Sequence, residues 1–271
     1  MKRTERVGAI IATLSNNPGK IYSLQHFCHM FDAAKSSVSE DIHIASEALK
    51  ATETGYIETI SGAKGGVKFI PDFSHTQLSL LQEEFCEKMR DSSRILGGGF
   101  LYTSDIMFDT KLVARLASVF VKKFKDVGAN YVATVETKGI PLASMVAFQL
   151  NLPLVIIRRE AKVSEGSTVS INYFSGSYDR VQKMSIAKRA VTPGSTAIII
   201  DDFMRGGGSI RGIAEILAEF DVSIVGVGVA TASIKPEKKK IGQYTAIAYL
   251  GDVDEEKRTI DILPNERIFD V

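Results

Sequence analysis

The stretch AIIIDDFMRGGGSIRG, residues 197–212, constrains the fold more than any other part of the chain. Its first four residues are apolar and mostly β-branched without alternation, which is typical of a parallel strand buried on both faces. Asp201 and Asp202 follow at the carboxyl end of that strand, the edge at which open α/β sheets bind ligands. The glycines after them allow backbone N–H groups to surround an anion at the start of the next helix. The stretch therefore predicts an α/β sheet that carries a ligand site.

The order of the acids and glycines indicates the class of ligand. The stretch lacks the Lys and hydroxyl residue that a Walker loop needs after its second glycine, and no G-x-G-x-x-G follows the strand directly. Carboxylates accept hydrogen bonds from neighbouring hydroxyls, and backbone amides hold phosphate oxygens, so the pattern suits a ribose 5-phosphate. The alternative is an acidic turn whose glycines adopt positive φ.

The chain is long enough for two domains, because 271 residues with 45% hydrophobic content can bury two cores. The pattern changes near Pro71, so we predict one domain over residues 1–73 and an α/β domain over 74–271. The tail is expected to add the strands TAIAYL and RTIDIL to the sheet edge. Short apolar runs and the start MKRTERVGAII indicate neither a membrane span nor a signal peptide, which favours a cytoplasmic protein. The histidines and the two cysteines show no metal-site spacing.

The first domain is predicted to be a winged helix-turn-helix. Three segments carry apolar residues at helical spacing, the third from about Lys35 to Ala51, and GYIETISGAKGGVKFIP then predicts a hairpin with a glycine-rich turn. In such a fold the third helix enters the DNA major groove and the wing contacts the backbone. Residues 1–75 hold eight basic and eight acidic side chains, so a solvated helical surface stays open as the alternative. The residues predicted to contact DNA are Arg3, Arg6, Lys35, Ser36, Ser37, Ser39, Glu40, His43, Lys64 and Lys68.

Residues 197–209 resemble the phosphoribosyl-pyrophosphate (PRPP) motif of type I phosphoribosyltransferases, in which apolar residues and two acids precede a glycine-rich loop that ends in Thr or Ser. The resemblance implies that the two acids hold the ribose hydroxyls and that the loop holds the 5-phosphate. The enzymes usually carry Thr where this chain has Gly206. The resemblance further implies that the loop in VETKGIPLA binds pyrophosphate and that the loop in LVIIRREAKVSEGSTVSINYFSGSYDRV closes over the ligand, with Arg158, Arg159, Lys162 and Tyr178 as its candidate contacts. Tyr102 and Phe203 are candidates to stack on a base, with aromatic core packing as the alternative.

The residues predicted to contact PRPP are Tyr102, Thr137, Lys138, Gly139, Arg158, Lys162, Tyr178, Asp201, Asp202, Phe203, Met204, Arg205, Gly206, Gly207, Gly208 and Ser209. For Lys138, and for Arg158, Arg159, Lys162 and Tyr178 of the closing loop, the alternative is a solvated surface position.

Over most of its length the chain resembles the PurR-type purine operon regulators of Gram-positive bacteria, in AAKSSVSEDI, GAKGGVKFIP, TKGIPLA, EGSTVSINYFSGS and IIIDDFMRGGGSI. The resemblance implies a homodimeric transcription factor with a winged helix-turn-helix and a phosphoribosyltransferase-like domain built on a mainly parallel sheet. It would bind operator DNA, require no cofactor, and sense PRPP, with or without Mg²⁺, in a pocket that no longer catalyses. The alternative is an active purine phosphoribosyltransferase with an accessory DNA-binding domain, but no acid or base for a nucleobase stands out.

Overall fold

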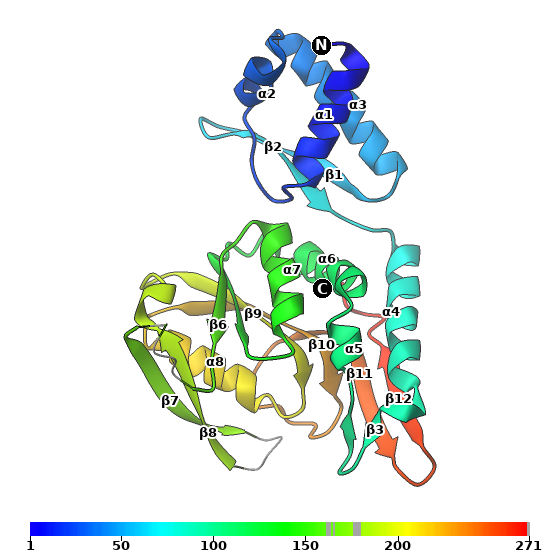
Figure 1. Ribbon diagram of the computed structural model, residues 1–271, viewed down its shortest axis with the longest axis vertical. Helices are drawn as coiled ribbons and strands as arrows, with labels where there is room; N and C mark the ends of the chain where they lie inside the picture. The colour runs from blue at the N-terminus through cyan, green and yellow to red at the C-terminus, as the bar shows by residue number, and fades with distance from the viewer. Residues whose placement is uncertain (161–163, 165, 176–179, 270–271) are drawn as a thin grey trace. The chain divides into compact units, whose positions relative to one another are not determined.

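The computed structural model describes residues 1–160, 164, 166–175 and 180–269 (Figure 1). Contacts divide the chain into two compact units, which are described separately below. The first contains Met1–His75 with Phe148–Asn151, and the second contains Thr76–Ala147 with Leu152–Val271. Within the described ranges, no helix is long and apolar enough to cross a membrane.

The first unit consists of three helices followed by an antiparallel hairpin, as the sequence predicted. These elements are α1 (Arg3–Ser15), α2 (Leu24–Phe31), α3 (Lys35–Ala51), β1 (Gly55–Ile60) and β2 (Gly66–Pro71). The apolar stripes of the three helices meet in one core that includes Ile10, Phe27 and Val38, all fully buried. Tyr22, between α1 and α2, forms an antiparallel bridge with Val67 and so ties the helices to the wing.

The second unit is built on a six-stranded sheet in the order β12-β11-β10-β9-β5-β6. All neighbouring pairs are parallel except β11 with the edge strand β12, which confirms a mainly parallel sheet and the two strands expected from the tail. The strands are β5 (Tyr131–Val135), β6 (Leu154–Ile157), β9 (Thr196–Met204), β10 (Ser223–Ser233), β11 (Thr245–Asp254) and β12 (Thr259–Pro264).

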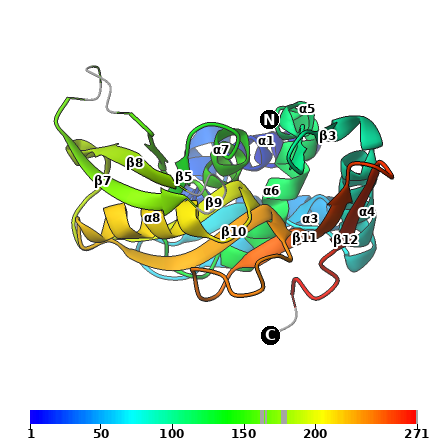
Figure 2. The same cartoon turned by 90° about the horizontal axis from the view of Figure 1, so that it is seen from below.

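Helices and small ribbons surround this sheet. The helices are α4 (His75–Arg90), α5 (Ser104–Met107), α6 (Thr110–Phe124), α7 (Ile140–Leu150) and α8 (Gly208–Ala218), with 3-10 turns at Ser92–Arg94 and Lys188–Ala190. The ribbons are β3 (Ile95–Leu96) with β4 (Phe100–Leu101) and β7 (Thr168–Ser175) with β8 (Arg180–Ala187). The β7–β8 hairpin packs against α8 (Figure 2).

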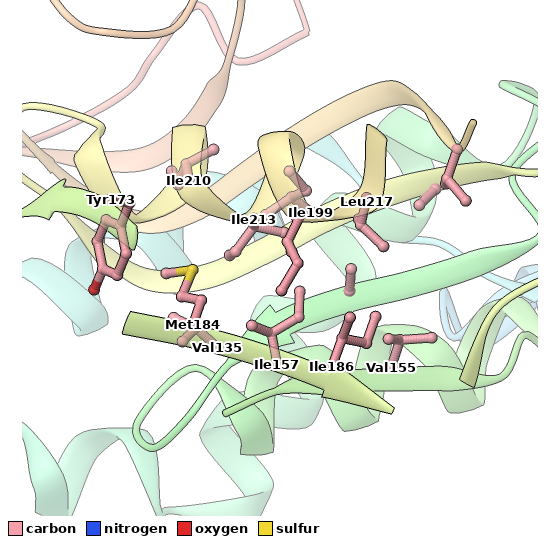
Figure 3. Packing of buried hydrophobic residues seen from close by; sticks show 14 of the residues in the cluster. Val135, Val155, Ile157, Tyr173, Met184, Ile186, Ile199, Ile210, Ile213 and Leu217 are labelled. Atoms are coloured by element: carbon pink, nitrogen blue, oxygen red, sulfur yellow. The ribbon is translucent and has the colours of Figure 1, made fainter. Parts of the chain in front are cut away.

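The core of the sheet explains why α8 lies where it does. Ile213 and Leu217 of α8 pack with Ile199 of β9 and with Met184 and Ile186 of β8 in one buried cluster (Figure 3). On the strands nearby, Gly226 and Gly228 make room for the rings of α6, because a Cβ at Gly228 would lie 2.6 Å from the ring of Phe120. These contacts place α8 and α6 against the sheet.

The chain order of the strands creates a crevice between β5 and β9. From β5 the chain passes through α7 to β6 on one side, whereas from β9 it passes through α8 to β10 on the other side. Because such crossovers are right-handed, α7 and α8 lie on opposite faces of the sheet. The loops that follow β5 and β9 therefore diverge at the carboxyl edge, which is where open α/β sheets bind ligands.

Candidate functional site

Two adjacent acids, Asp201 and Asp202, lie near the carboxyl end of β9, which continues to Met204, two residues beyond the acids. Asp201 is only 4% exposed, and one of its carboxylate oxygens, Oδ1, accepts a hydrogen bond of 3.0 Å from the backbone N–H of Asp202. Burial raises the pKa of the Asp201 carboxyl well above its usual range, and the neighbouring Asp202 charge raises it further. A buried acid with a raised pKa at the switch point of a parallel sheet marks a candidate binding site.

The loop after these acids leads directly into the amino end of α8. Gly207 is the N-cap residue, with a left-handed φ of +79° and no side-chain cap for the helix. The first N–H groups of α8 therefore receive no side-chain acceptor from the cap, and the helix dipole favours an anion there. Residues 203–210 line a small pocket at this point. The position of the glycine-rich loop at a helix amino end is the one that the sequence predicted.

The loop between β5 and α7 lies against the first of the two acids. A Cβ on Gly139 would meet the Asp201 carboxylate and would lie 2.7 Å from the Thr134 hydroxyl oxygen, Oγ1, so only glycine fits there. The neighbouring Lys138 ammonium donates to the Thr103 hydroxyl at 3.3 Å. The structure thus brings the loop of residues 137–139 and the acids of β9 together, as expected for one site. Whether they contact PRPP stays a prediction.

Thr134 is a site residue that the sequence analysis missed. It lies on the buried strand β5 with no exposed surface, and its hydroxyl has no hydrogen-bond partner among the described residues. A buried hydroxyl without a partner costs free energy, so its position beside Asp201 adds a polar group that a ligand could satisfy. The signal available in the sequence was a single Thr within the apolar run of YVATV.

The predicted contact Arg158 lies beside the same loop but is engaged with Glu136. One Arg158 guanidinium nitrogen is 3.3 Å from the Glu136 carboxylate, and the other oxygen of that carboxylate accepts from the Arg159 N–H at 2.8 Å. The Arg158 backbone also bridges to Ser185 of β8. Glu136 was not among the predicted residues, although it directly precedes the loop. Lys162 and Tyr178 lie outside the described residues.

The two aromatic candidates are both exposed. Tyr102 has 47% of its surface exposed and Phe203 has 37%, so core packing, the alternative for these rings, is wrong. The carbonyl of Tyr102 accepts from Arg94, whose guanidinium also binds both carboxylate oxygens of Asp105 at 2.6 and 2.8 Å. This bidentate ion pair holds the pKa of Asp105 below its usual range and fixes the backbone that carries Tyr102.

Most of the residues predicted to contact DNA are available at the surface of the first unit. Besides Arg3 on α1, the exposed ones are Lys35, Ser36, Ser39, Glu40, His43 and Lys64, and Ser37 is partly buried. They occupy the outer face of α3 and the turn between β1 and β2. This arrangement matches a recognition helix with a wing.

Four predicted DNA contacts form ion pairs within the first unit: Arg3, Arg6, Lys68 and the exposed Glu40. Arg6, whose side chain is 14% exposed, lies 2.6 Å from the carboxylate of Asp41, which is fully buried. Arg3 pairs with Glu40 and with the same Asp41, and Lys68 lies 3.1 Å from Glu58. A phosphate contact by Arg6 would require breaking a buried ion pair, so the geometry favours a structural role for this residue.

Comparison with protein families divides the chain in the same way as its contacts. Residues 2–71 match the N-terminal domain of the bacterial purine repressor, and residues 107–254 match the phosphoribosyl transferase domain. Among solved structures, the adenine phosphoribosyltransferase of Thermoanaerobacter pseudethanolicus covers 61% of this chain and 97% of its own, with a TM-score of 0.53 and 21% identity. That likeness establishes the fold of the second unit.

Curated relatives match nearly the whole chain. The probable purine biosynthesis transcriptional regulator PurR of Streptococcus pneumoniae is 40% identical over 97% of this chain and 96% of its own. The purine biosynthesis transcriptional repressor PurR of Bacillus subtilis is 36% identical over 96% and 92%, and the purine biosynthesis transcriptional activator PurR of Lactococcus lactis is 35% identical over 97% of both. The xanthine phosphoribosyltransferase of Oenococcus oeni is 27% identical over 53% of this chain.

Proposed function

Because this chain belongs to the PurR family of bacterial purine biosynthesis regulators, we propose that PRPP binds to its α/β unit and controls its affinity for operator DNA. The chain is a transcriptional regulator and not an enzyme, since the relatives that match its full length are regulators and the xanthine phosphoribosyltransferases match only about half of it. The observation that carries the proposal is the pair Asp201 and Asp202 at the carboxyl edge of β9, beside a glycine-rich loop that begins α8.

The chemistry of the crevice supports PRPP as the ligand. Carboxylates accept hydrogen bonds from neighbouring ribose hydroxyls, and the amino end of α8 favours the 5-phosphate. Lys138 adds a positive charge in the loop next to Asp201, where it can meet the pyrophosphate. The hydroxyl donors of the ligand would stabilise the charged form of the Asp201 carboxyl group. Titrations with and without Mg²⁺ would show whether the ion accompanies PRPP.

A coupling between PRPP binding and operator DNA binding tests the proposed regulation directly. We expect PRPP to change the affinity for operator DNA by about 5-fold to 150-fold, the usual range of allosteric coupling. Gel-shift titrations with PRPP would measure the change and its sign, which the relatives leave open because one is named a repressor and another an activator. Thermodynamic linkage requires operator DNA to change the affinity for PRPP by the same factor. Identical PRPP affinity with and without operator DNA would rule the proposal out.

An assay of pyrophosphate release distinguishes a regulator that only binds PRPP from an active phosphoribosyltransferase. With PRPP, Mg²⁺ and adenine, guanine, hypoxanthine or xanthine, pyrophosphate release should stay at background. PRPP binding needs only hydroxyl and phosphate contacts, whereas transfer needs an oriented base and groups that stabilise the charge on the departing pyrophosphate. Steady release with any one base, at a rate that depends on protein concentration, would favour the alternative of an active phosphoribosyltransferase.

Substitutions on α3 and on the wing should affect DNA binding in different ways. We expect Ser36→Ala to lower discrimination at one base pair by about 1–3 kcal/mol, because a hydroxyl near the start of a recognition helix contacts base edges. Lys64→Ala should weaken binding to all sequences and reduce the salt slope by about one charge, as a phosphate contact does. Gel shifts over a salt series, with operator and scrambled DNA, would measure both. If the wing variant alone lost discrimination, the docking would be the reverse of the one proposed.

We also propose that the protein acts in the cytoplasm as a homodimer. Two winged domains related by a twofold axis can occupy two half-sites of a palindromic operator. Sedimentation of the protein without DNA would test this, since a dimer has twice the mass of one chain.

A further inference from the structure

A lysine-rich segment after β10, residues 234–242, lies against the glycine-rich loop that begins α8. We call this segment the strap. Lys239 donates from its ammonium group to the carbonyl of Arg205 at 2.7 Å and to that of Ser233 at 2.5 Å. The backbone N–H of Lys240 donates to the carbonyl of Gly206 at 2.9 Å. The strap therefore bonds to two consecutive carbonyls of the loop.

Apolar contacts accompany these hydrogen bonds. A Cβ on Gly206 would lie 3.7 Å from the ring of Pro236, and a Cβ on Gly207 would lie 3.3 Å from Ile241. Pro236 and Ile241 of the strap therefore lie close to one side of the loop, at Gly206 and Gly207. Lys239 itself is partly buried, and this burial lowers the pKa of its ammonium group.

The two hydrogen bonds determine where the loop's N–H groups point. In a trans peptide the carbonyl and the next N–H point in opposite directions. Because the Arg205 carbonyl faces Lys239, the N–H of Gly206 faces away from the strap, and because the Gly206 carbonyl faces Lys240, the N–H of Gly207 does the same. Successive N–H groups on one side of a loop form a concave anion site. That site continues into the uncapped first turn of α8.

We infer that the strap preorganises the anion loop, and that Lys239 is the positioning residue that holds the loop's N–H groups toward the ligand. This inference rests on the proposed function for the identity of the ligand, PRPP. Lys239 acts through the backbone carbonyls and not on the phosphate. The orientation of the loop is therefore a property of the protein without ligand and can be measured separately.

The test compares Lys239→Ala with Lys238→Ala in the full-length protein. Lys238 is exposed and lies in the same strap, so its replacement removes the same charge without removing the two carbonyl contacts. Hydrogen exchange of the peptide that covers residues 203–210 should become at least tenfold faster in Lys239→Ala without ligand and stay unchanged in Lys238→Ala. Calorimetry should show PRPP binding about 10-fold to 100-fold weaker in Lys239→Ala, the effect of losing charged hydrogen bonds, and within about twofold of wild type in Lys238→Ala.

Two further variants, Lys239→Met and Lys239→Arg, test whether the ammonium group of Lys239 is what positions the loop. Lys239→Met keeps the apolar stem and should repeat the loss, which guards against misfolding of the Ala variant, whereas Lys239→Arg keeps the donors and should restore most of the affinity. Unchanged exchange in both Lys239→Ala and Lys239→Met would overturn the inference, as would equal losses of PRPP affinity in Lys238→Ala and Lys239→Ala. Faster loop exchange in Lys239→Ala, in a protein whose wild type binds no PRPP, would uphold the strap and refute the proposed ligand.

Discussion

Replacing both Asp201 and Asp202 with Asn should abolish the response to PRPP while leaving operator binding unchanged. The carboxylates lie in the α/β unit, and in the proposed complex they accept the hydrogen bonds of the ribose hydroxyls. Each hydrogen bond to a charged group contributes about 1.5–3 kcal/mol, so losing two of them should weaken PRPP binding by about 100-fold or more. Calorimetry would measure the PRPP affinity, and gel shifts without PRPP would measure operator binding. A double variant that binds PRPP like the wild type would remove the basis of the proposed site.

The stability of the ligand-free single variant Asp201→Asn provides the control for misfolding. Because the pKa of Asp201 is raised in the folded protein, the folded state binds a proton more tightly than the unfolded chain. The contribution of the Asp201 carboxyl group to the free energy of unfolding is therefore most favourable below its unfolded pKa of about 3.9. This contribution falls as the pH rises toward the folded pKa. Asn does not titrate, so Asp201→Asn should have a higher melting temperature than the wild type as the pH rises through the folded pKa of Asp201. If Asp201→Asn alone loses PRPP affinity while it is more stable than the wild type, the loss cannot come from misfolding.

The strand and loop that carry the site could be predicted from the sequence because their signals are local. An apolar β-branched run followed by two acids and three glycines specifies a buried strand, its carboxyl end and a helix start within 16 consecutive residues, 197–212. The structure has β9 and α8 at these positions. The loop of residues 137–139 was found in the same way, from a strand, a turn and a helix in sequence.

Contacts between distant segments could not be predicted from such signals. Lys239 meets the carbonyl of Arg205, 34 residues earlier, and a run of lysines ordinarily indicates a solvated surface. The buried Thr134 and the carboxylate of Glu136 acquire their roles only when β5 is placed beside β9 and β6. In each case the partner is supplied by the order of strands in the sheet, which no short sequence pattern encodes.

The ion pairs of the first unit could not be predicted from the sequence either, because a count of basic and acidic residues treats every charge as solvated. Asp41 lies three residues after the buried Val38 on α3, so helical spacing puts it on the core-facing stripe. There it pairs with Arg6 of α1 at 2.6 Å and with Arg3 at 3.4 Å. Two of the predicted phosphate contacts therefore hold α1 against α3, and the basic surface available to DNA is smaller than the sequence suggested.

Asp41→Ala should consequently unfold the first unit and abolish operator binding, while PRPP binding to the second unit persists. Removing one partner of a buried ion pair costs about 3–5 kcal/mol, because the other charge is left buried without compensation. Arg6 would be that charge, since its side chain is only 14% exposed. A unit of some 75 residues has a core that rarely supplies more than about 3–5 kcal/mol of net stability, so the loss removes nearly all of it.

Differential scanning calorimetry of the full-length variant would show this as an early transition of the first unit, separate from the main one. The matched control is Glu47→Ala on the same helix, whose ion pair with Lys50 is exposed and should contribute little to the stability of the unit. If Asp41→Ala left the melting profile and operator binding like those of Glu47→Ala, the buried pair would not be what joins α1 to α3. If it abolished PRPP binding together with operator binding, the two units would depend on each other for folding, and the second would not be an independent sensor.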